Sequence, residues 1–195
     1  MGEIDLLRDR AGEGDAEEQF RLALRYDNAD GVPRDPVAAA NWYRFAAEQD
    51  HAQAQFHLGL MLHSGDVGFE RDDKAAVDWF TRAAGQGLAD AQFNLALMYY
   101  NGEGVANDDA SAFKWFSSAA SQGHAKAQFN LGVLYANGHG VEVDYRECYQ
   151  LWLIASMQGE ANAHANLAMM RDKLTTTEAE AAQSAAVDWA NQHAE

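Results

Sequence analysis

Two patterns in the chain carry residue types that can do covalent or acid–base chemistry. Ser111 and Lys114 have the Ser-x-x-Lys spacing with which penicillin-binding enzymes place a lysine beside a nucleophilic serine. An aspartate also recurs at intervals of 36 or 37 residues, and paired carboxylates can serve general acid–base catalysis. The recurring aspartates are Asp35, Asp72, Asp108 and Asp144.

Both patterns have a structural explanation that we favour over catalysis. The Ser-Asp-Asn and Lys-Thr-Gly motifs that accompany Ser-x-x-Lys in those enzymes are absent from the chain. Each aspartate precedes a segment with helical periodicity, where its carboxylate can accept bonds from the free N–H groups of a helix start. Pro36, directly after Asp35, suits the first helical position. We therefore expect the aspartates to be helix caps and assign no catalytic residue.

The histidines and glycines do not predict a metal or cofactor site. His57 and His63 are six residues apart, so they do not share a helix face. His51, His124 and His139 fall in expected connections, and isolated surface histidines explain them all. The Gly-x-Gly pairs lack the strand context of a nucleotide loop. The sequence thus predicts no metal site and no cofactor.

Charge and cysteine content limit the partners and the compartment. The chain has 14 Lys and Arg against 30 Asp and Glu, a formal net charge of −16. Nucleic acid and anionic membranes need a basic surface, so we exclude them as partners. A basic or neutral protein partner fits this charge, although solubility alone explains it equally well. Cys148 is the single cysteine, and the start of the chain has no signal-peptide apolar region, so we expect a cytoplasmic protein.

These residues belong to a segment that recurs along the chain. A motif Ala-x-x-Gln-Phe opens at Ala16, Ala52, Ala89 and Ala125, and most copies continue through a glycine turn, an aspartate and a pair of aromatic residues. The apolar spacing predicts two helices per copy, joined at the glycines, and a period of this size predicts a stacked array. We expect one continuous domain with a capping half repeat, four repeats and a divergent capping repeat. Their bounds are 1–15, 16–51, 52–88, 89–124, 125–160 and 161–195.

Several positions predict how the helices pack. Gly59 and Gly132 are small where a neighbouring helix must approach closely. Cys148 stands where other copies have alanine, so we expect a buried filler and not a reactive thiol. Thr175 and Glu178 have capping-box spacing, which predicts the start of the final helix.

The order of these motifs resembles that of the Sel1-like repeat proteins, which are relatives of tetratricopeptide repeats. The shared residues are Ala-x-Ala-Gln-Phe-Asn-Leu-Gly-x-x-Tyr, Gly-x-Gly-Val, Asp and Ala-x-x-Trp-Phe. The resemblance implies an all-α fold, a right-handed α/α superhelical solenoid whose first helices line a concave face. It also implies an adaptor or scaffold, often bacterial. Some members have been described as β-lactamases, and many secreted relatives carry paired cysteines that this chain lacks.

Four positions of each repeat are predicted to face away from the second helix and so to be free for a partner. They are the second, sixth, ninth and thirteenth, counted from the opening alanine. The sixth holds Arg21, His57, Asn94, Asn130 and Asn166. The ninth holds Leu24, Leu60, Leu97, Val133 and Met169, and further candidates are Lys126, Asn101 and Asn137.

The row at the sixth position has two explanations that the sequence leaves open. Asparagine donates and accepts, so a row of asparagines suits an extended peptide backbone. The same side chains can instead bond neighbouring repeats. The ninth position would give a groove its apolar floor. The phenylalanines at the fifth position could join that floor, but we favour core packing for them.

The function that we predict is a non-enzymatic adaptor that binds a peptide or protein segment, with a basic partner to match the acidic charge. An immunity-type or regulatory inhibitor acting through the same surface is the alternative. A β-lactamase-like hydrolase is the least favoured possibility. We expect a monomer.

Overall fold

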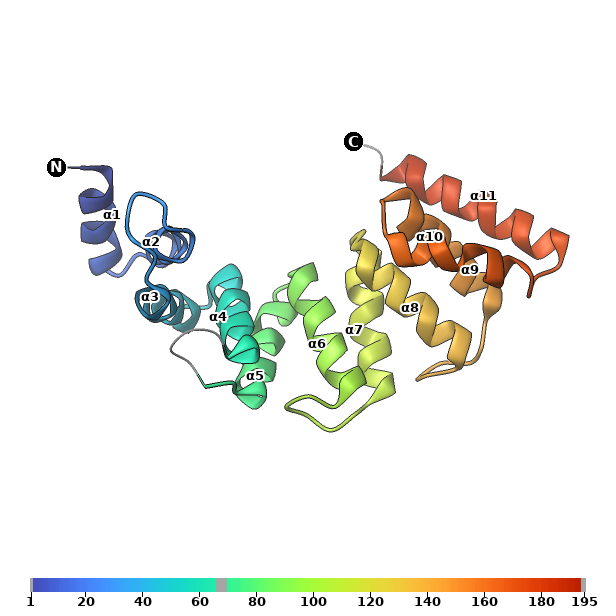
Figure 1. Ribbon diagram of the computed structural model, residues 1–195, viewed down its shortest axis with the longest axis horizontal. Helices are drawn as coiled ribbons and strands as arrows, with labels where there is room; N and C mark the ends of the chain where they lie inside the picture. The colour runs from blue at the N-terminus through green and yellow to red at the C-terminus, as the bar shows by residue number, and fades with distance from the viewer. Residues whose placement is uncertain (1, 66–69, 194–195) are drawn as a thin grey trace. The chain divides into compact units, whose positions relative to one another are not determined.

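The computed structural model describes residues 2–65 and 70–193, which form eleven α-helices and no strand (Figure 1). The helices are α1 (Glu3–Gly12), α2 (Ala16–Asn28), α3 (Pro36–Glu48), α4 (Ala52–Ser64), α5 (Asp73–Gly85), α6 (Ala89–Asn101), α7 (Asp109–Ser121), α8 (Ala125–Asn137), α9 (Tyr145–Met157), α10 (Ala161–Arg171) and α11 (Thr176–Gln192). The fold is therefore all-α, as the periodicity predicts.

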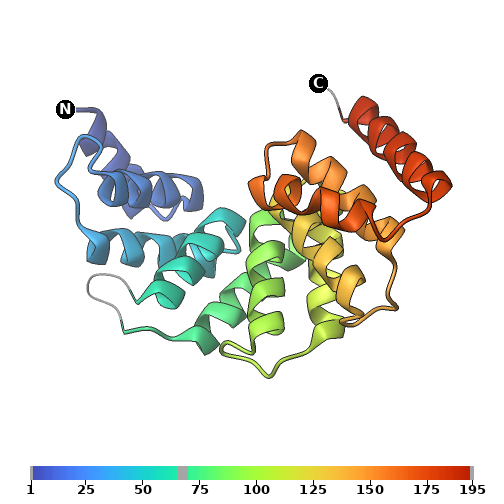
Figure 2. The same ribbon diagram turned by 45° about the vertical axis from the view of Figure 1, so that its right-hand side comes forward.

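The chain forms two compact units. The N-terminal unit comprises residues 1–91 and 103–106, and the C-terminal unit comprises residues 92–102 and 107–195. In the N-terminal unit α2 packs against α3, α3 against α4, and α4 against α5. In the C-terminal unit α8 packs against α7 and α9, and α9 also contacts α10 and α11 (Figures 1 and 2). Each unit is thus a stack of helix pairs.

The recurring aspartates cap the second helix of each pair, as the sequence predicts. Each carboxylate accepts a bond from the N–H group three residues further on. These bonds are 2.9 Å at Asp35, 2.9 Å at Asp72, 3.1 Å at Asp108 and 3.0 Å at Asp144. Pro36 occupies the first turn of α3, also as predicted. An N-cap of this kind stabilises a helix by about 1 kcal/mol, so capping accounts for the residue type and its position.

Two histidines have the same role at the first helices, and here the prediction of isolated surface histidines is wrong. His51 and His124 are the N-caps of α4 and α8, and their Nδ1 atoms accept backbone N–H bonds of 3.2 Å and 3.1 Å. Their rings stack on Phe20 and Phe93, with centroids 4.6 Å apart in both pairs. His139 is also partly buried, near a tyrosine ring. A neutral imidazole has a ring nitrogen that accepts like a carboxylate, which explains the substitution.

Small residues admit the aromatic side chains of the second helices. A Cβ atom on Gly59 would lie 2.7 Å from the ring of Phe80, and one on Gly132 would lie 2.6 Å from Nε1 of Trp152. Both aromatic residues are almost fully buried. The close approach predicted at these glycines is confirmed.

In the turns of the third and fourth repeats, Gly102-Glu-Gly104 and Gly138-His-Gly140, the second glycine has a contact that extends beyond its own repeat. Gly104 and Gly140 have φ of +69° and +71°, a region that favours glycine. A Cβ atom on either would overlap the backbone at the start of the preceding second helix, at Asp73 and Asp109 respectively. These glycines therefore serve both the turn and the packing of one repeat on the next.

A set of buried glutamines links the repeats, which the sequence did not reveal. Each opening motif places one glutamine in the core, and it accepts a bond from a second glutamine at the end of the same repeat. The pairs are Gln49 to Gln19 at 2.8 Å, Gln86 to Gln55 at 2.8 Å, Gln122 to Gln92 at 2.7 Å and Gln158 to Gln128 at 2.6 Å. Gln55 also donates to the Ala47 carbonyl of the preceding repeat, at 3.0 Å. The buried glutamine thus joins two successive repeats.

The remaining packing predictions hold in the C-terminal unit. Cys148 is fully buried, and burial raises the pKa of its thiol to about 12, so the thiolate that reacts is not formed near neutral pH. Thr175 and Glu178 form the predicted capping box at the start of α11.

Candidate functional site

The sixth-position side chains bond mainly within their own helix. Nδ2 of Asn130 donates to the Lys126 carbonyl at 2.8 Å, and Nδ2 of Asn166 donates to the Asn162 carbonyl at 2.7 Å. Arg21 pairs with a glutamate one turn earlier, at 3.1 Å. These amide nitrogens therefore hold the backbone of their own helix and do not tie neighbouring repeats.

His57 differs from the other members of the row because its ring is part of an aromatic cluster. It stacks on Tyr43 with a centroid distance of 5.0 Å and an angle of 11° between the rings. Burial lowers the pKa of His57, which favours a neutral ring. Burial also raises the pKa of Tyr43, whose hydroxyl donates to Asp27 at 3.4 Å. The histidine thus contributes to packing within the N-terminal unit.

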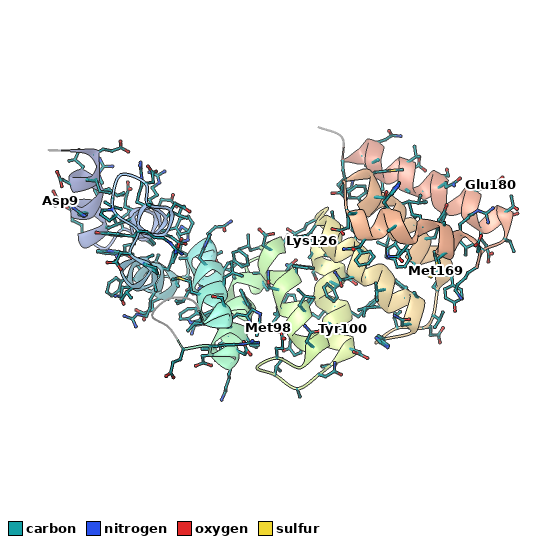
Figure 3. All side chains as sticks on the ribbon, in the orientation of Figure 1. Asp9, Met98, Tyr100, Lys126, Met169 and Glu180 are labelled. Carbon is teal, nitrogen blue, oxygen red and sulfur yellow. The ribbon has the colours of Figure 1, made fainter. Side chains whose placement is uncertain are left out.

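The other predicted positions differ in how far their side chains are exposed to solvent. At the ninth position Leu60, Leu97 and Val133 are half-buried. Asn101 and Asn137 are exposed at the ends of their helices. Lys126 is exposed in the first turn of α8 (Figure 3). Asn94 is partly buried in α6.

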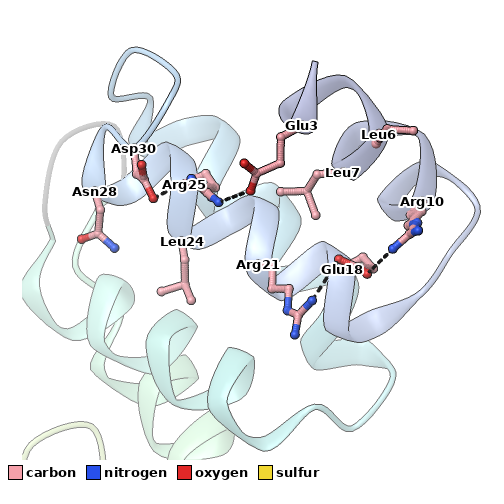
Figure 4. A pocket seen from close by; sticks show the side chains of 10 residues that line it. All are labelled: Glu3, Leu6, Leu7, Arg10, Glu18, Arg21, Leu24, Arg25, Asn28 and Asp30. Atoms are coloured by element: carbon pink, nitrogen blue, oxygen red, sulfur yellow. Dashed lines mark hydrogen bonds and ion pairs between the residues drawn. The ribbon is translucent and has the colours of Figure 1, made fainter. Parts of the chain in front are cut away.

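A hollow in the N-terminal unit lies over the first helix of the first repeat. It has a volume of about 570 Å³ and lies between α1 and α2 (Figure 4). Leu6, Leu7 and Leu24 contribute apolar surface. Arg25 is held between Glu3 and Asp30, at 2.7 Å from each, and Arg10 and Arg21 both pair with Glu18. We call this the N-terminal hollow.

A second hollow lies in the C-terminal unit, where α8, α9 and α10 meet. Its volume is about 360 Å³. The lining comprises Val133, Ala136, Asn137, Tyr145, Trp152, Met169, Met170 and Lys173. We call this the C-terminal hollow.

The two hollows lie over equivalent positions of the repeat. The sixth, ninth and thirteenth residues of the first repeat, Arg21, Leu24 and Asn28, line the N-terminal hollow. The ninth and thirteenth residues of the fourth repeat, Val133 and Asn137, line the C-terminal hollow. In each unit the structure thus brings some of the predicted residues together around a concavity.

Five lining residues of the C-terminal hollow were not predicted as binding residues: Ala136, Tyr145, Trp152, Met170 and Lys173. Two of them carried a signal in the sequence. Lys173 occupies the thirteenth position of the last repeat, so the repeat register contained the signal for it. Tyr145 begins α9, where the second helices of earlier repeats begin with proline or aspartate. That departure from the pattern was the available signal for Tyr145.

The Ser-x-x-Lys pair is not arranged as a nucleophile and base. The Ser111 hydroxyl donates to the capping carboxylate of Asp108 at 2.6 Å. The Lys114 ammonium lies over the ring of Trp115, 4.9 Å from its centroid.

Among the residues that the structure describes, no cluster of three or more His, Cys, Asp or Glu side chains is placed to hold a metal ion. Within residues 2–65 and 70–193, none of the helices has the length and apolar character needed to cross a membrane.

Helix pairs stacked through buried glutamines and turn glycines define an all-helical repeat protein of the solenoid class. A family profile for the Sel1 repeat matches residues 19–51, 52–88, 89–124 and 125–160. The chain belongs to the Sel1 repeat family. Proteins of this family generally mediate protein–protein interactions and are generally not catalytic.

Solved structures agree with this assignment. A Sel1 repeat protein from Oxalobacter formigenes is 31% identical, with a TM-score of 0.75 over 80% of this chain and 64% of that one. A protective antigen of uropathogenic Escherichia coli with an SLR fold is 27% identical, with a TM-score of 0.65 over 98% of this chain and 49% of that one. The chain therefore spans less than two thirds of either relative. An immunity protein of Pseudomonas aeruginosa, 20% identical with a TM-score of 0.52 over 95% of this chain and 72% of that one, shares the fold. A search of curated proteins gave no match.

Proposed function

We propose that the protein is a non-enzymatic adaptor that binds a segment of a partner protein on the outward-facing positions of its first helices. The observation that carries this proposal is the placement of the hollows. In each unit a concavity lies over the sixth, ninth or thirteenth positions of a first helix, lined by leucines among charged side chains in the N-terminal unit and mainly by apolar side chains in the C-terminal unit. Concave apolar sites edged by a few polar groups are where proteins usually bind their ligands.

The proposal extends along the same positions of the intervening repeats. Asn94, Leu97 and Asn101 occupy them in α6, and Leu60 does so in α4. Lys126 adds an exposed cation at the second position of α8. A basic partner is part of the proposal, because a net charge of −16 attracts cationic proteins over distances longer than a contact.

An inhibitory role is the same binding event with a different consequence for the partner. The likeness to the immunity protein is at the level of the fold, so it does not select this role. The distinction is made by assaying the partner's own activity with and without the adaptor. A loss of that activity on binding would make the protein an inhibitor.

The test uses two double variants matched for exposure. Leu6→Glu with Met169→Glu places charges in both hollows, at side chains 44% and 53% exposed. Val37→Glu with Val187→Glu places the same charges at side chains that are each 48% exposed and line neither hollow. Because all four side chains are exposed, both proteins should keep the wild-type helical signal and melting temperature.

Affinity purification with mass spectrometry identifies the partner, and calorimetry with the purified partner then compares the three proteins. We expect the hollow variant to bind at least about tenfold more weakly, since a buried charge at an apolar contact costs more than about 1.4 kcal/mol. The control should bind as the wild type does. Equal binding by all three proteins, or a larger loss in the control, would show that the hollows are not the binding surface.

A further inference from the structure

The C-terminal hollow is formed where the last repeat departs from the pattern. In the third repeat the start of the second helix, at Asp109, is covered by Gly140 from the turn of the next repeat. In the fourth repeat the equivalent residue is Tyr145, and the glycine turn that would cover it is replaced by residues 172–175. Lys173 takes that place, with its ammonium 5.0 Å from the centre of the Tyr145 ring. The hollow is therefore specific to this end of the array.

Its walls suit one large apolar side chain. Trp152 and Met170 are only 3% and 1% exposed, whereas Met169 is 53% exposed at the hollow. The volume of about 360 Å³ lies near the lower end of the range of roughly 300–1,000 Å³ found for small-molecule pockets. Methionine side chains adapt readily to the shape of a guest. A single leucine, methionine or phenylalanine side chain matches a space of this kind.

The formal charge among the lining residues of the hollow is positive, whereas the net charge of the chain is −16. Lys173 is the one Lys, Arg, Asp or Glu among the residues that line it. The Lys173 ammonium contacts the Tyr145 ring, 5.0 Å from its centre. An ammonium beside an apolar wall complements a carboxylate next to an apolar residue.

We propose that the C-terminal hollow is the anchor site for an acidic–apolar segment of the partner protein. One large apolar side chain of the segment enters beside Met169 and Trp152, and a neighbouring aspartate or glutamate pairs with Lys173. This inference rests on the proposed function and specifies its C-terminal contact. It concerns a local motif, whereas the attraction of a basic partner acts over the whole molecule.

The first experiment locates the binding of short peptides by NMR. The protein is labelled with ¹³C at the methionine methyl groups and titrated with the peptide acetyl-Gly-Ser-Phe-Glu-Ser-Gly-amide. The methyl signals of Met169 and Met170 should shift, because both residues line the hollow. Those of Met98, which is 2% exposed, and Met157, which is 54% exposed outside the hollow, should not. Shifts confined to Met157, or none at saturating peptide, would overturn the proposal.

The second experiment tests the chemistry of the segment. Peptides with Ala in place of Phe, or Lys in place of Glu, should bind more weakly. In Lys173→Glu the Phe-Glu peptide should bind about two- to tenfold more weakly and the Phe-Lys peptide should become the better ligand, since an exposed ion pair contributes about 0.2–1 kcal/mol and the reversal replaces attraction by repulsion. Lys114→Glu is the matched control, because Lys114 lies 4.9 Å over an aromatic ring outside the hollow.

The outcomes separate this inference from the proposed function. If the Phe-Glu and Phe-Lys peptides bind equally well to the wild type, or if Lys114→Glu has the effect of Lys173→Glu, the acidic–apolar preference is wrong. The proposed function would still stand if the hollow double variant loses its purified partner. If that variant keeps the partner while the methyl signal of Met169 shifts with the peptide, the C-terminal hollow binds the peptide but the hollows are not the surface that binds the partner. The proposed function would then be wrong.

Discussion

Replacing Gln55 by glutamate is a sharp test of how the repeats are joined. Gln55 is fully buried in α4 and uses both ends of its carboxamide. Its nitrogen donates to the Ala47 carbonyl at 3.0 Å and contacts Asp50 Oδ1 at 3.3 Å, and its oxygen accepts from Gln86 at 2.8 Å. Glutamate has nearly the same shape, but its ionised form accepts only. The change therefore keeps the bond from Gln86. It also places a carboxylate oxygen next to the Ala47 carbonyl oxygen and Asp50 Oδ1, neither of which can donate a hydrogen bond.

The loss of stability in Gln55→Glu cannot exceed the free energy needed to protonate the new carboxyl group. A buried carboxyl that faces another carboxylate is far more stable when it is neutral. Protonating a group with an unfolded-state pKa of about 4.3 at pH 7 spans about 2.7 pH units, which costs about 3.7 kcal/mol at 1.36 kcal/mol per unit. We expect Gln55→Glu to lower the stability at pH 7 by about 3 kcal/mol, and by no more than about 3.7 kcal/mol.

The sign of the pH dependence follows from the same argument. Because the folded-state pKa of the new carboxyl would be raised, the loss should be absent below about pH 4 and should grow as the pH rises towards the folded-state value. Urea unfolding of Gln55→Glu and wild type at a series of pH values measures this difference. Hydrogen exchange of the α4 amides reports the same region without assuming a two-state array.

Gln53→Glu is the control, because Gln53 lies on the same helix but is exposed. A surface change of this kind should alter stability by less than about 0.5 kcal/mol at any pH. If Gln55→Glu were as stable as Gln53→Glu at pH 7, the buried glutamine would not hold the repeats together as described.

Three further predictions follow from other contacts. Gly132→Ala should destabilise by about 1–3 kcal/mol through overpacking against the indole ring of α9, whereas Gly85→Ala, with no atom within 4 Å of its Cβ, should be neutral or stabilising in the same melting experiment. Asp108 has its pKa lowered by bonds to a serine hydroxyl and to backbone N–H groups. Its ionised form should therefore add stability above pH 3.8 that is lost as the pH falls further, and melting curves should show Asp108→Asn approaching the wild type in acid. Asn94→Ala with Asn130→Ala should keep the helical signal but weaken binding of the purified partner, and unfolding of this variant would show that the asparagines are structural.

The sequence predicts those features that depend on residue type and local spacing. An aspartate before each second helix can be assigned as a cap because both its chemistry and its position repeat. Gly59 and Gly132 could be assigned to close packing for the same reason. The fold class follows because the period of the apolar residues fixes helices and the period of the motif fixes their stacking.

The features that the sequence left undecided depend on partners far away in the chain. Nothing local to Gln55 shows that Gln86 bonds to it across a whole helix pair. A histidine such as His51 has several common roles, and capping is visible only once its ring is placed against α4. The contact of Tyr145 with Lys173 depends on the path of a connection that has no counterpart in the other repeats.

The overlap between a turn glycine and the preceding helix start gives the third and fourth repeats a surface that fits the repeat before them. Gly104 fits against the helix start at Asp73, and Gly140 fits against the equivalent start at Asp109. A block such as residues 89–124 therefore carries one surface that docks backward and one that receives the next block. Duplicating or deleting a whole block would join surfaces that already match, whereas an insertion of any other length would not. We therefore expect the array to tolerate the gain or loss of one whole repeat at these contacts better than insertions of other lengths.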